Sequence, residues 1–326
     1  MKIIDMHCDT VNRMYYGRQK GNNISLYDNN LSVDFKRMQT GDYLMQFFAC
    51  FVNMWETSTP QADAMGMIKM FCDEIVKHND MIGHVHSYEE LLHNMSKGKM
   101  SALLTIEEGG VLGGNMDMLH RVYEEGVRLI TLTWNYENEL GYPNRVDMQT
   151  GTAVPETERG LKNTGIEFVK EMEDLGIIVD VSHLGDAGFY DVAANTRKPF
   201  AASHSNARAV ASHVRNLKDD MIKTIGERGG VIGLNFCPAF LKDGKPENIV
   251  SRIEDMVRHI MYIRNVGGID VCALGSDFDG ISGELEINAC DKMDMLFESL
   301  VGLGLPYDEI DKIASGNILR FLRDVL

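Results

Sequence analysis

The sequence has few features of secreted or membrane proteins. Only six of its 326 residues are cysteine, and they are widely spaced with no Cys-x-x-Cys pair. In a chain of this length that pattern indicates buried, reduced thiols rather than a disulfide framework. No run approaches ~18 consecutive apolar residues, and the short apolar start meets Asp5 too early for a signal peptide. We therefore expect a cytoplasmic protein with no membrane partner.

Positive charge is also scarce. The chain has 32 Lys and Arg against 48 Asp and Glu, a formal net charge of −16. Such a surface repels phosphate backbones, so we expect no nucleic-acid partner, whereas surplus carboxylates suit divalent cations. With 31 Gly and 7 Pro the chain is not collagen-like, and 44% hydrophobic with 25% charged residues is typical of a globular protein.

Short apolar runs alternate with helical patterns along the whole chain. Runs such as Ile177-Ile178-Val179 are typical of parallel strands that are covered on both faces. The predicted strands are 3–7, 44–52, 101–106, 128–133, 177–181, 200–203, 231–235 and 271–275. The predicted helices are 62–78, 88–95, 118–125, 158–175, 218–228, 249–266, 293–300 and a closing segment over 307–326.

Eight strands alternating with helices predict an α/β fold, a (β/α)8 TIM-type barrel forming a single domain over 1–326. An open doubly wound sheet is the alternative. We expect the remaining residues to form helical insertions, at 53–98 and in a loop over 135–157, and a C-terminal helical cap. Met and aromatic residues within 43–71 are candidates for a homodimer interface.

Polar side chains follow several predicted strands, at the barrel end where active sites lie. In chain order they are His7 and Asp9, Glu107 or Glu108, His183, His204 and Asp277. His7 and Asp9 share one face of their strand because side chains alternate. Imidazole and carboxylate are zinc ligands, so the set predicts a metal site. Taken singly, each residue is explained as well by a buried core His or a turn-forming acid; His84-Val85-His86 lacks a strong strand and is interpreted as a surface loop.

As an ordered set these segments resemble the membrane dipeptidase (renal dipeptidase) family of zinc peptidases, within the metal-dependent hydrolases. The matching segments are Asp5–Thr10, Glu108-Gly-Gly, Leu175–His183, Ser203–Ser205, Arg215-Asn216 and Gly275–Gly280. Each segment alone is weakly specific, but their order and spacing match over nearly the whole chain.

The resemblance implies a barrel with two Zn²⁺ per chain. His7 and Asp9 would hold one ion, and His183 and His204 the other. Glu108, directly before two glycines, would bridge them, which leaves Glu107 as its neighbour and not a ligand. Manganese, cobalt or iron are alternative occupants of such a ligand set.

The resemblance also assigns residues to the substrate. Arg215 would bind the C-terminal carboxylate, a role that suits its planar, permanently charged fork. Asp277 would carry a proton from water to the leaving amine. The chain departs from the family at Trp134, where the best-known members have a His; an indole donates one hydrogen bond but takes up no proton.

The predicted function is a dinuclear zinc dipeptidase, which cleaves short peptides by a zinc-bridging hydroxide and accepts dipeptides, including those with a C-terminal D-residue. One alternative is a dimetal amidohydrolase acting on another small amide, a lactone or a phosphoester. Another is a non-catalytic ligand-binding barrel, with Trp134 marking the loss of turnover.

Overall fold

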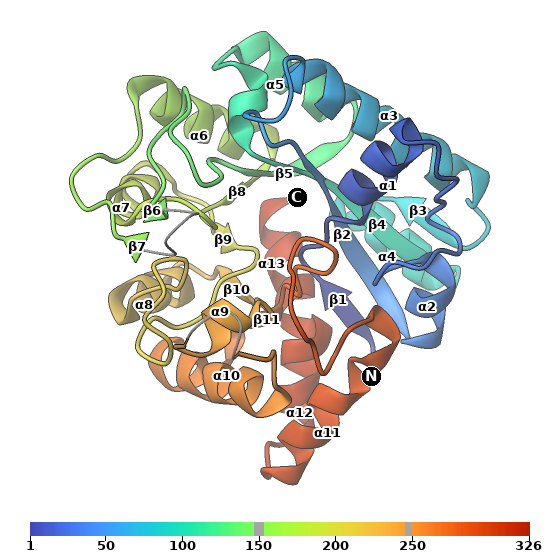
Figure 1. The fold of residues 1–326 in the computed structure, drawn as a ribbon. Coiled ribbons are helices and arrows are strands. Elements are labelled where there is room, and N and C mark those ends of the chain that lie inside the picture. Colours follow the sequence, from blue (N-terminus) through green and yellow to red (C-terminus); the bar gives the residue numbers. More distant parts are fainter. Residues whose placement is uncertain (147–152, 245–248) are drawn as a thin grey trace.

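Eight parallel strands close into a barrel in the computed structural model, which describes residues 1–146, 153–244 and 249–326 (Figure 1). In chain order they are β1 (Ile3–Asp5), β2 (Tyr43–Phe51), β4 (Met100–Glu107), β5 (Val127–Thr131), β8 (Ile178–Asp180), β9 (Ala201–Ala202), β10 (Val231–Leu234) and β11 (Cys272–Leu274). The ring closes because β1 pairs with both β2 and β11, and β2 pairs with β4. The prediction of a barrel rather than an open sheet is confirmed.

Two further strand pairings lie outside the ring. β3 (Ile82–His84), within the predicted 53–98 insertion, pairs with the first residues of β4, on the edge that β5 occupies further along the strand. β6 (Arg145–Val146) and β7 (Ala153–Val154) form a short antiparallel pair within the predicted 135–157 loop. Residues 147–152 of that loop lie outside the described part of the chain.

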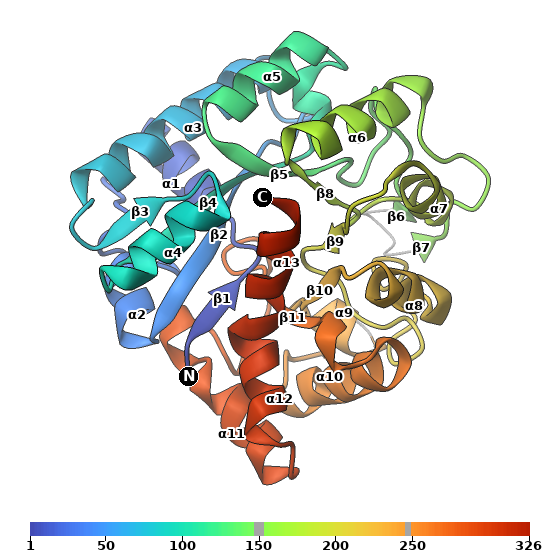
Figure 2. The same ribbon diagram turned by 180° about the vertical axis from the view of Figure 1, so that it is seen from behind.

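Helices surround the barrel in both views (Figures 1 and 2). They are α1 (Thr10–Gln19), α2 (Phe35–Thr40), α3 (Pro60–Lys77), α4 (Tyr88–Ser96), α5 (Met116–Glu124), α6 (Asn163–Leu175), α7 (Asp186–Asn195), α8 (Asp219–Glu227), α9 (Pro238–Leu241), α10 (Ile253–Gly267), α11 (Asp294–Gly302), α12 (Tyr307–Asp311) and α13 (Asn317–Val325). No described helix has both the length and the apolar character needed to cross a membrane.

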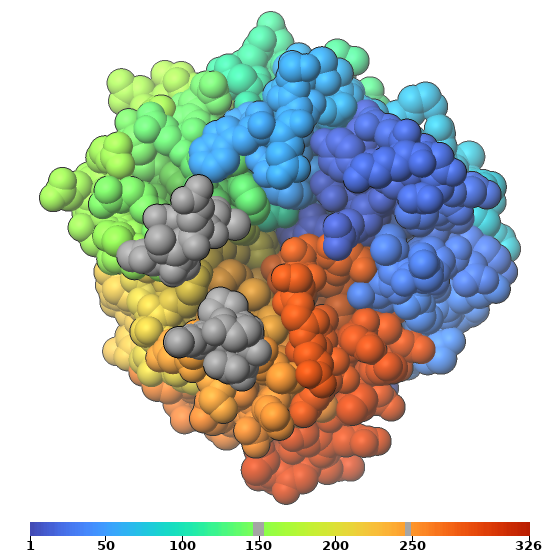
Figure 3. Space-filling view, in the orientation of Figure 1, coloured from blue at the N-terminus to red at the C-terminus, as the bar shows by residue number. Residues whose placement is uncertain are grey.

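The N-terminal end of the barrel is closed by α13, which crosses it in Figure 2. Phe321 and Leu322 of α13 pack with inward-facing strand residues such as Phe47, Leu103 and Leu129. This burial confirms the predicted C-terminal helical cap and places it at the bottom of the barrel. Because the bottom is filled, a substrate can reach the strands only from the opposite end, the face shown in Figure 3.

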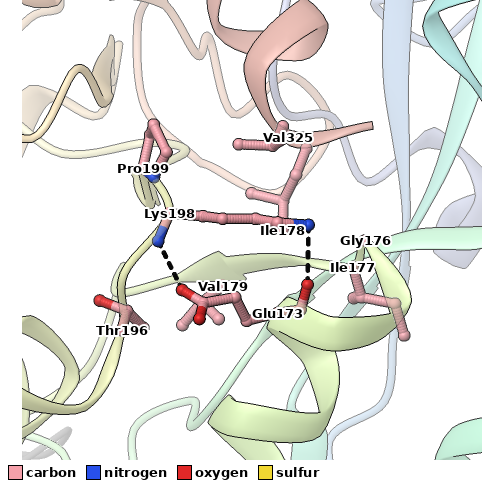
Figure 4. Close-up of a pocket in the computed structure, with 9 residues that line it drawn as sticks. All are labelled: Glu173, Gly176, Ile177, Ile178, Val179, Thr196, Lys198, Pro199 and Val325. Carbon is pink, nitrogen blue, oxygen red and sulfur yellow. Dashed lines mark hydrogen bonds between the residues drawn. The ribbon is translucent and has the colours of Figure 1, made fainter.

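A small pocket lies beside this closed end, between α6, β8 and the end of α13 (Figure 4). Lys198 makes two hydrogen bonds across this pocket. Its backbone N–H donates to the Glu173 carboxylate (2.5 Å), and its Nζ donates to the Glu173 backbone oxygen (2.9 Å). These bonds satisfy the polar groups of the pocket internally, so we interpret it as a packing feature.

Candidate active site

The strand-end residues predicted from the sequence converge at the open end of the barrel. Each lies at the end of a different strand or within three residues after it, and each is at most 9% exposed. The set is His7 after β1, Glu107 at the end of β4, His183 after β8, His204 after β9 and Asp277 after β11. The barrel therefore brings together side chains that are far apart in the sequence: His7 and Asp277 are separated by 270 positions.

Glu107 lies at the centre of this group. Its Oε1 is 3.0 Å from His183 Nε2 and 3.7 Å from His204 Nε2. Its Oε2 is 3.4 Å from His7 Nε2. The two carboxylate oxygens thus face two different sets of ligand atoms.

The expectation that Glu108 occupies this place is wrong. Its carboxylate turns away and accepts hydrogen bonds from the backbone N–H of Gly110 and of Trp134 (both 2.7 Å) and from Asn138 Nδ2 (2.5 Å). Glu107 is the last residue of β4, whereas Glu108 has a left-handed φ of 79° and begins a 3-10 turn.

The alternation of β4 explains this placement. Leu103 belongs to the cluster inside the barrel, whereas Leu104 and Ile106 belong to the cluster outside it. Because side chains alternate along a strand, Glu107 shares the inner face with Leu103. Following this alternation of inward and outward side chains along β4 is the sequence signal that identifies Glu107.

The tautomers of two histidines are fixed by their outer nitrogens. His183 Nδ1 lies 2.8 Å from Asn135 Oδ1, an acceptor, so Nδ1 carries the proton. His204 Nδ1 lies 2.7 Å from Ser203 Oγ, whose hydroxyl donates to Asp180 Oδ2 (2.6 Å). Both Nε2 atoms therefore present lone pairs, and they lie 3.0 Å apart.

Burial keeps these two imidazoles neutral. Desolvation, together with the positive charge of Arg215, lowers the pKa of His183 to about 4, and desolvation lowers the pKa of His204 well below its usual value. Two lone pairs and Glu107 Oε1 then meet with no proton among them. Three acceptors at one point fit a bound cation, and the outer hydrogen bonds are those that orient histidine ligands.

His7, Asp9 and Asp277 form the other half of the group. His7 Nε2 lies 3.3 Å from Asp9 Oδ2 and 3.8 Å from Asp277 Oδ1. Among the described residues, His7 Nδ1 and Asp9 Oδ1 are buried without a hydrogen-bond partner. Two candidate ligand groups follow, one with His7, Glu107 and His204 and one with His7, Asp9 and Asp277.

The titration of these groups reflects crowded negative charge. Burial, reinforced by the charge of Glu107, raises the pKa of Asp9 to about 6. Burial, with the charges of Asp9 and Glu107, raises the pKa of Asp277 to about 8. Burial opposes the positive charge on His7, but Glu107 and Asp9 outweigh it and raise the pKa of His7 well above 6.5. A cation at this place would relieve the repulsion.

Arg215 lies beside the half of the group that contains His183 and His204. It is 6% exposed, and its Nη2 and Nη1 make only long contacts, to the His204 backbone oxygen (3.3 Å) and to Ser205 Oγ (3.5 Å). Within the described part of the chain its Nε has no hydrogen-bond partner. A buried guanidinium with unused donors is suited to an anionic ligand group.

Trp134 lies at the rim. It is half-buried, and its ring centroid is 6.1 Å from that of His183 and 4.9 Å from that of Phe51. His84, by contrast, lies on β3 outside the barrel, where its Nε2 contacts the Gly126 backbone oxygen (3.2 Å), so it takes no part in the site.

Sequence reasoning missed three supporting residues. Asn135 and Asp180 orient the two histidines, and Asn235 Nδ2 donates to Asp277 Oδ2 (2.9 Å). Asp180, the last residue of β8 and three positions before His183, offered a signal. The two asparagines offered none, because polar residues are common in loops.

The chain also matches known proteins over its full length. The family model described as membrane dipeptidase (peptidase family M19) matches residues 1–326. A dipeptidase of Aspergillus oryzae, aclJ, is 30% identical over 305 residues, which cover 90% of this chain and 70% of that protein.

Solved structures agree with the fold. The dipeptidase AC, a metallo peptidase of family M19, superposes with a TM-score of 0.89 at 26% identity, covering 100% of this chain and 98% of that one. A metallo peptidase from Rhodobacter sphaeroides, solved with a phosphinate mimic of L-Ala-D-Ala, gives a TM-score of 0.89 at 24% identity, covering 100% and 99%. The chain therefore belongs to the membrane dipeptidase family, peptidase family M19, and is a metal-dependent dipeptidase.

Proposed function

We propose that the enzyme hydrolyses dipeptides with two zinc ions, one held by His7 and Asp9 and the other by His183 and His204, with Glu107 between them. The observation that carries this proposal is the divided carboxylate of Glu107, with one oxygen toward His7 and the other toward His183 and His204. The nitrogen and carboxylate donors fit zinc. Bound cations would supply Lewis-acid activation of water and of the peptide carbonyl.

Asp277 is the proposed proton carrier. Its Oδ2 is fixed by Asn235, whereas its Oδ1 faces His7 Nε2. A carboxyl group with one oxygen fixed and the other directed toward the proposed ligands is suited to accept and return a proton, as a general acid–base group must. Asp277 takes the proton of the attacking water and delivers it to the leaving amine.

Arg215 is the proposed anchor of the substrate. Its free donors would bind the C-terminal carboxylate, which places the peptide bond near Glu107 and restricts the enzyme to short peptides. The related Rhodobacter sphaeroides enzyme was solved with a mimic of L-Ala-D-Ala. We extend this substrate class, a dipeptide with a C-terminal D-residue, to the present enzyme.

Metal removal tests the proposal. We expect a chelator to abolish hydrolysis of L-Ala-D-Ala, zinc to restore it, and elemental analysis of the restored protein to give two zinc ions per chain. Full activity of the metal-free protein would contradict the metal mechanism. One ion per chain at full activity would contradict the dinuclear site.

A further inference from the structure

Four aromatic side chains form a continuous surface beside the site. We call Phe51, Trp55, Trp134 and Tyr136 the aromatic wall. Ring centroids are 4.5 Å apart for Trp55 and Tyr136, 5.6 Å for Tyr136 and Trp134, and 4.9 Å for Trp134 and Phe51. The wall continues inward to His183, 6.1 Å from Trp134, so it reaches from the surface to a proposed metal ligand.

The wall is held rigidly. The Tyr136 hydroxyl accepts a hydrogen bond from the Met54 backbone N–H (2.8 Å) and donates to the Val52 backbone oxygen (3.4 Å), which joins the loop after β5 to the loop after β2. Glu108 fixes the other end by accepting from the Trp134 N–H. The Tyr136 ring on which Trp55 packs is therefore fixed before a ligand binds and needs little further ordering.

The outer part of the wall is open to solvent. Trp55 is 71% exposed, whereas Tyr136 beneath it is buried. In Figure 3 the light-blue segment that follows β2 lies at the rim of the mouth, beside the green segment that follows β5. A large exposed aromatic ring on a rigid support beside a catalytic group is typical of a ligand-binding surface.

The outer side of the wall, which follows β2, lies across the barrel ring from the strand before the proposed anchor, whereas Trp134 and Tyr136 follow β5, two strands from β9. Arg215 belongs to the segment after β9, and Phe51 and Trp55 to the end of β2 and the loop after it. In the closed ring β2 is four strands from β9 in either direction. A dipeptide whose carboxylate binds Arg215 therefore extends its N-terminal residue across Glu107 toward the wall.

We propose that the aromatic wall binds the side chain of the N-terminal residue of the substrate, so that the enzyme prefers dipeptides with a large apolar or aromatic residue there. This inference rests on the proposed function. Contact between a substrate ring and rigid aromatic rings removes apolar surface from water and adds favourable ring–ring contact. A charged N-terminal side chain gains neither and loses hydration.

Kinetics with matched substrates test the preference. We expect kcat/KM for Phe-D-Ala to exceed that for Ala-D-Ala by about 10-fold, the scale of specificity from one apolar subsite. In Trp55→Ala the ratio should fall toward one. The matched control is Tyr307→Ala, which removes an aromatic side chain of similar exposure (69%) on α12 and should leave the ratio unchanged.

Fluorescence gives a second readout that does not depend on turnover. The chain has only two tryptophans, and both belong to the wall. In Trp134→Phe the emission comes from Trp55 alone. We expect a phosphinate mimic of Phe-D-Ala to shift this emission to shorter wavelength, because the ligand ring excludes water, and the Ala-D-Ala mimic to shift it less.

The outcomes separate this inference from the proposed function. Hydrolysis of both dipeptides with equal kcat/KM overturns the wall's role and leaves the dipeptidase intact. Hydrolysis of neither contradicts the proposed function. A preference for Lys-D-Ala over Phe-D-Ala overturns the inference in another way, since it would identify Glu56 beside Trp55 as the recognition group. Tryptophan emission that depends on protein concentration instead would assign the wall to a dimer interface.

Discussion

Two adjacent glutamates differ in role because they point in opposite directions. We expect Glu107→Gln to lower kcat/KM by at least about 10³-fold and to reduce zinc content, since it removes the negative charge that lies between His7 and the pair His183 and His204. Glu108→Gln keeps a hydrogen-bonding group against Trp134 and should cost about 10–100-fold with zinc retained, as for groups that support a ligand. Kinetics with elemental analysis decide. Equal zinc loss in both variants would contradict the distinction.

Gly280 is a position where hydrogen alone fits. A Cβ there would meet the carboxylate oxygens of Asp9 and Asp277. We expect Gly280→Ala to displace one of these groups and to lower both zinc affinity and kcat/KM by at least 10-fold, on the scale of ligand misplacement. The control is Gly302→Ala on α11, where a Cβ meets nothing within 4 Å. Unchanged zinc affinity together with unchanged kcat/KM in Gly280→Ala would contradict the close packing of Gly280 against these two carboxylates.

Asp277 gives the metal-free protein a measurable pH dependence. Its pKa is raised to about 8 in the folded state, from about 3.8 when unfolded, so the folded chain binds more protons between these values. The stabilisation is present at low pH and is lost as pH rises through about 8. Between pH 6.5 and 8.5 we expect Tm of the metal-free protein to fall more steeply than Tm of Asp277→Asn. Parallel curves would mean that the folded pKa is not raised.

The site was largely predictable from residue types at strand ends. Five of the predicted residues converge as expected: His7, Asp9, His183, His204 and Asp277. The reason is that the apolar strands run parallel, so the polar residues that follow them all lie at the same end of the barrel. The choice between Glu107 and Glu108 failed because the Glu-Gly-Gly pattern took precedence over strand parity. The left-handed backbone at His183 and Asp277 (φ of 67° and 63°) has no sequence signal, since such conformations are imposed by surrounding structure.

At the scale of elements, the eight barrel strands begin within one residue and end within two residues of the predicted ranges, because each is a largely apolar run buried on both faces. The helices α1, α2, α7 and α9 were missed, and α2 and α9 are only six and four residues long. α1 buries only Thr10, Val11 and Met14, so the sequence lacks the apolar periodicity from which a helix is predicted. α7 contains a buried glycine, Gly188, whose close packing against Leu184 replaces the usual large apolar side chain.

The cap helix α13 offers a test of packing. Phe321 is fully buried inside the barrel bottom. We expect Phe321→Ala to lower the free energy of unfolding by about 3–5 kcal/mol, the usual cost of removing a buried aromatic ring. Leu303→Ala, at a position 63% exposed, should change it by under about 0.5 kcal/mol. Denaturant unfolding compares the two; similar small losses would mean that α13 is not part of the core.

At the scale of the whole molecule, metal binding and folding are coupled. The proposed ligands lie at the end of β4 and within four residues after β1, β8 and β9, so the unfolded chain has no preformed site. We expect a chelator to lower Tm by several degrees and zinc to restore it, since a ligand that binds only the folded state stabilises it. Glu107→Gln, with its ligand set broken, should respond much less. An equal response would place the stabilising ion elsewhere.

The closure of the ring between β1 and β11 sets an order for biogenesis. The first strand leaves the ribosome long before its neighbour β11, whose Leu274 pairs with Asp5. Until β11 and α13 have been made, β1 lacks one of its two neighbouring strands, and the inward-facing apolar side chains of the barrel lack the helix that covers them. The growing chain therefore carries an unfinished sheet and His7 far from Asp277, and the enzyme acquires a competent centre only once translation has passed both elements.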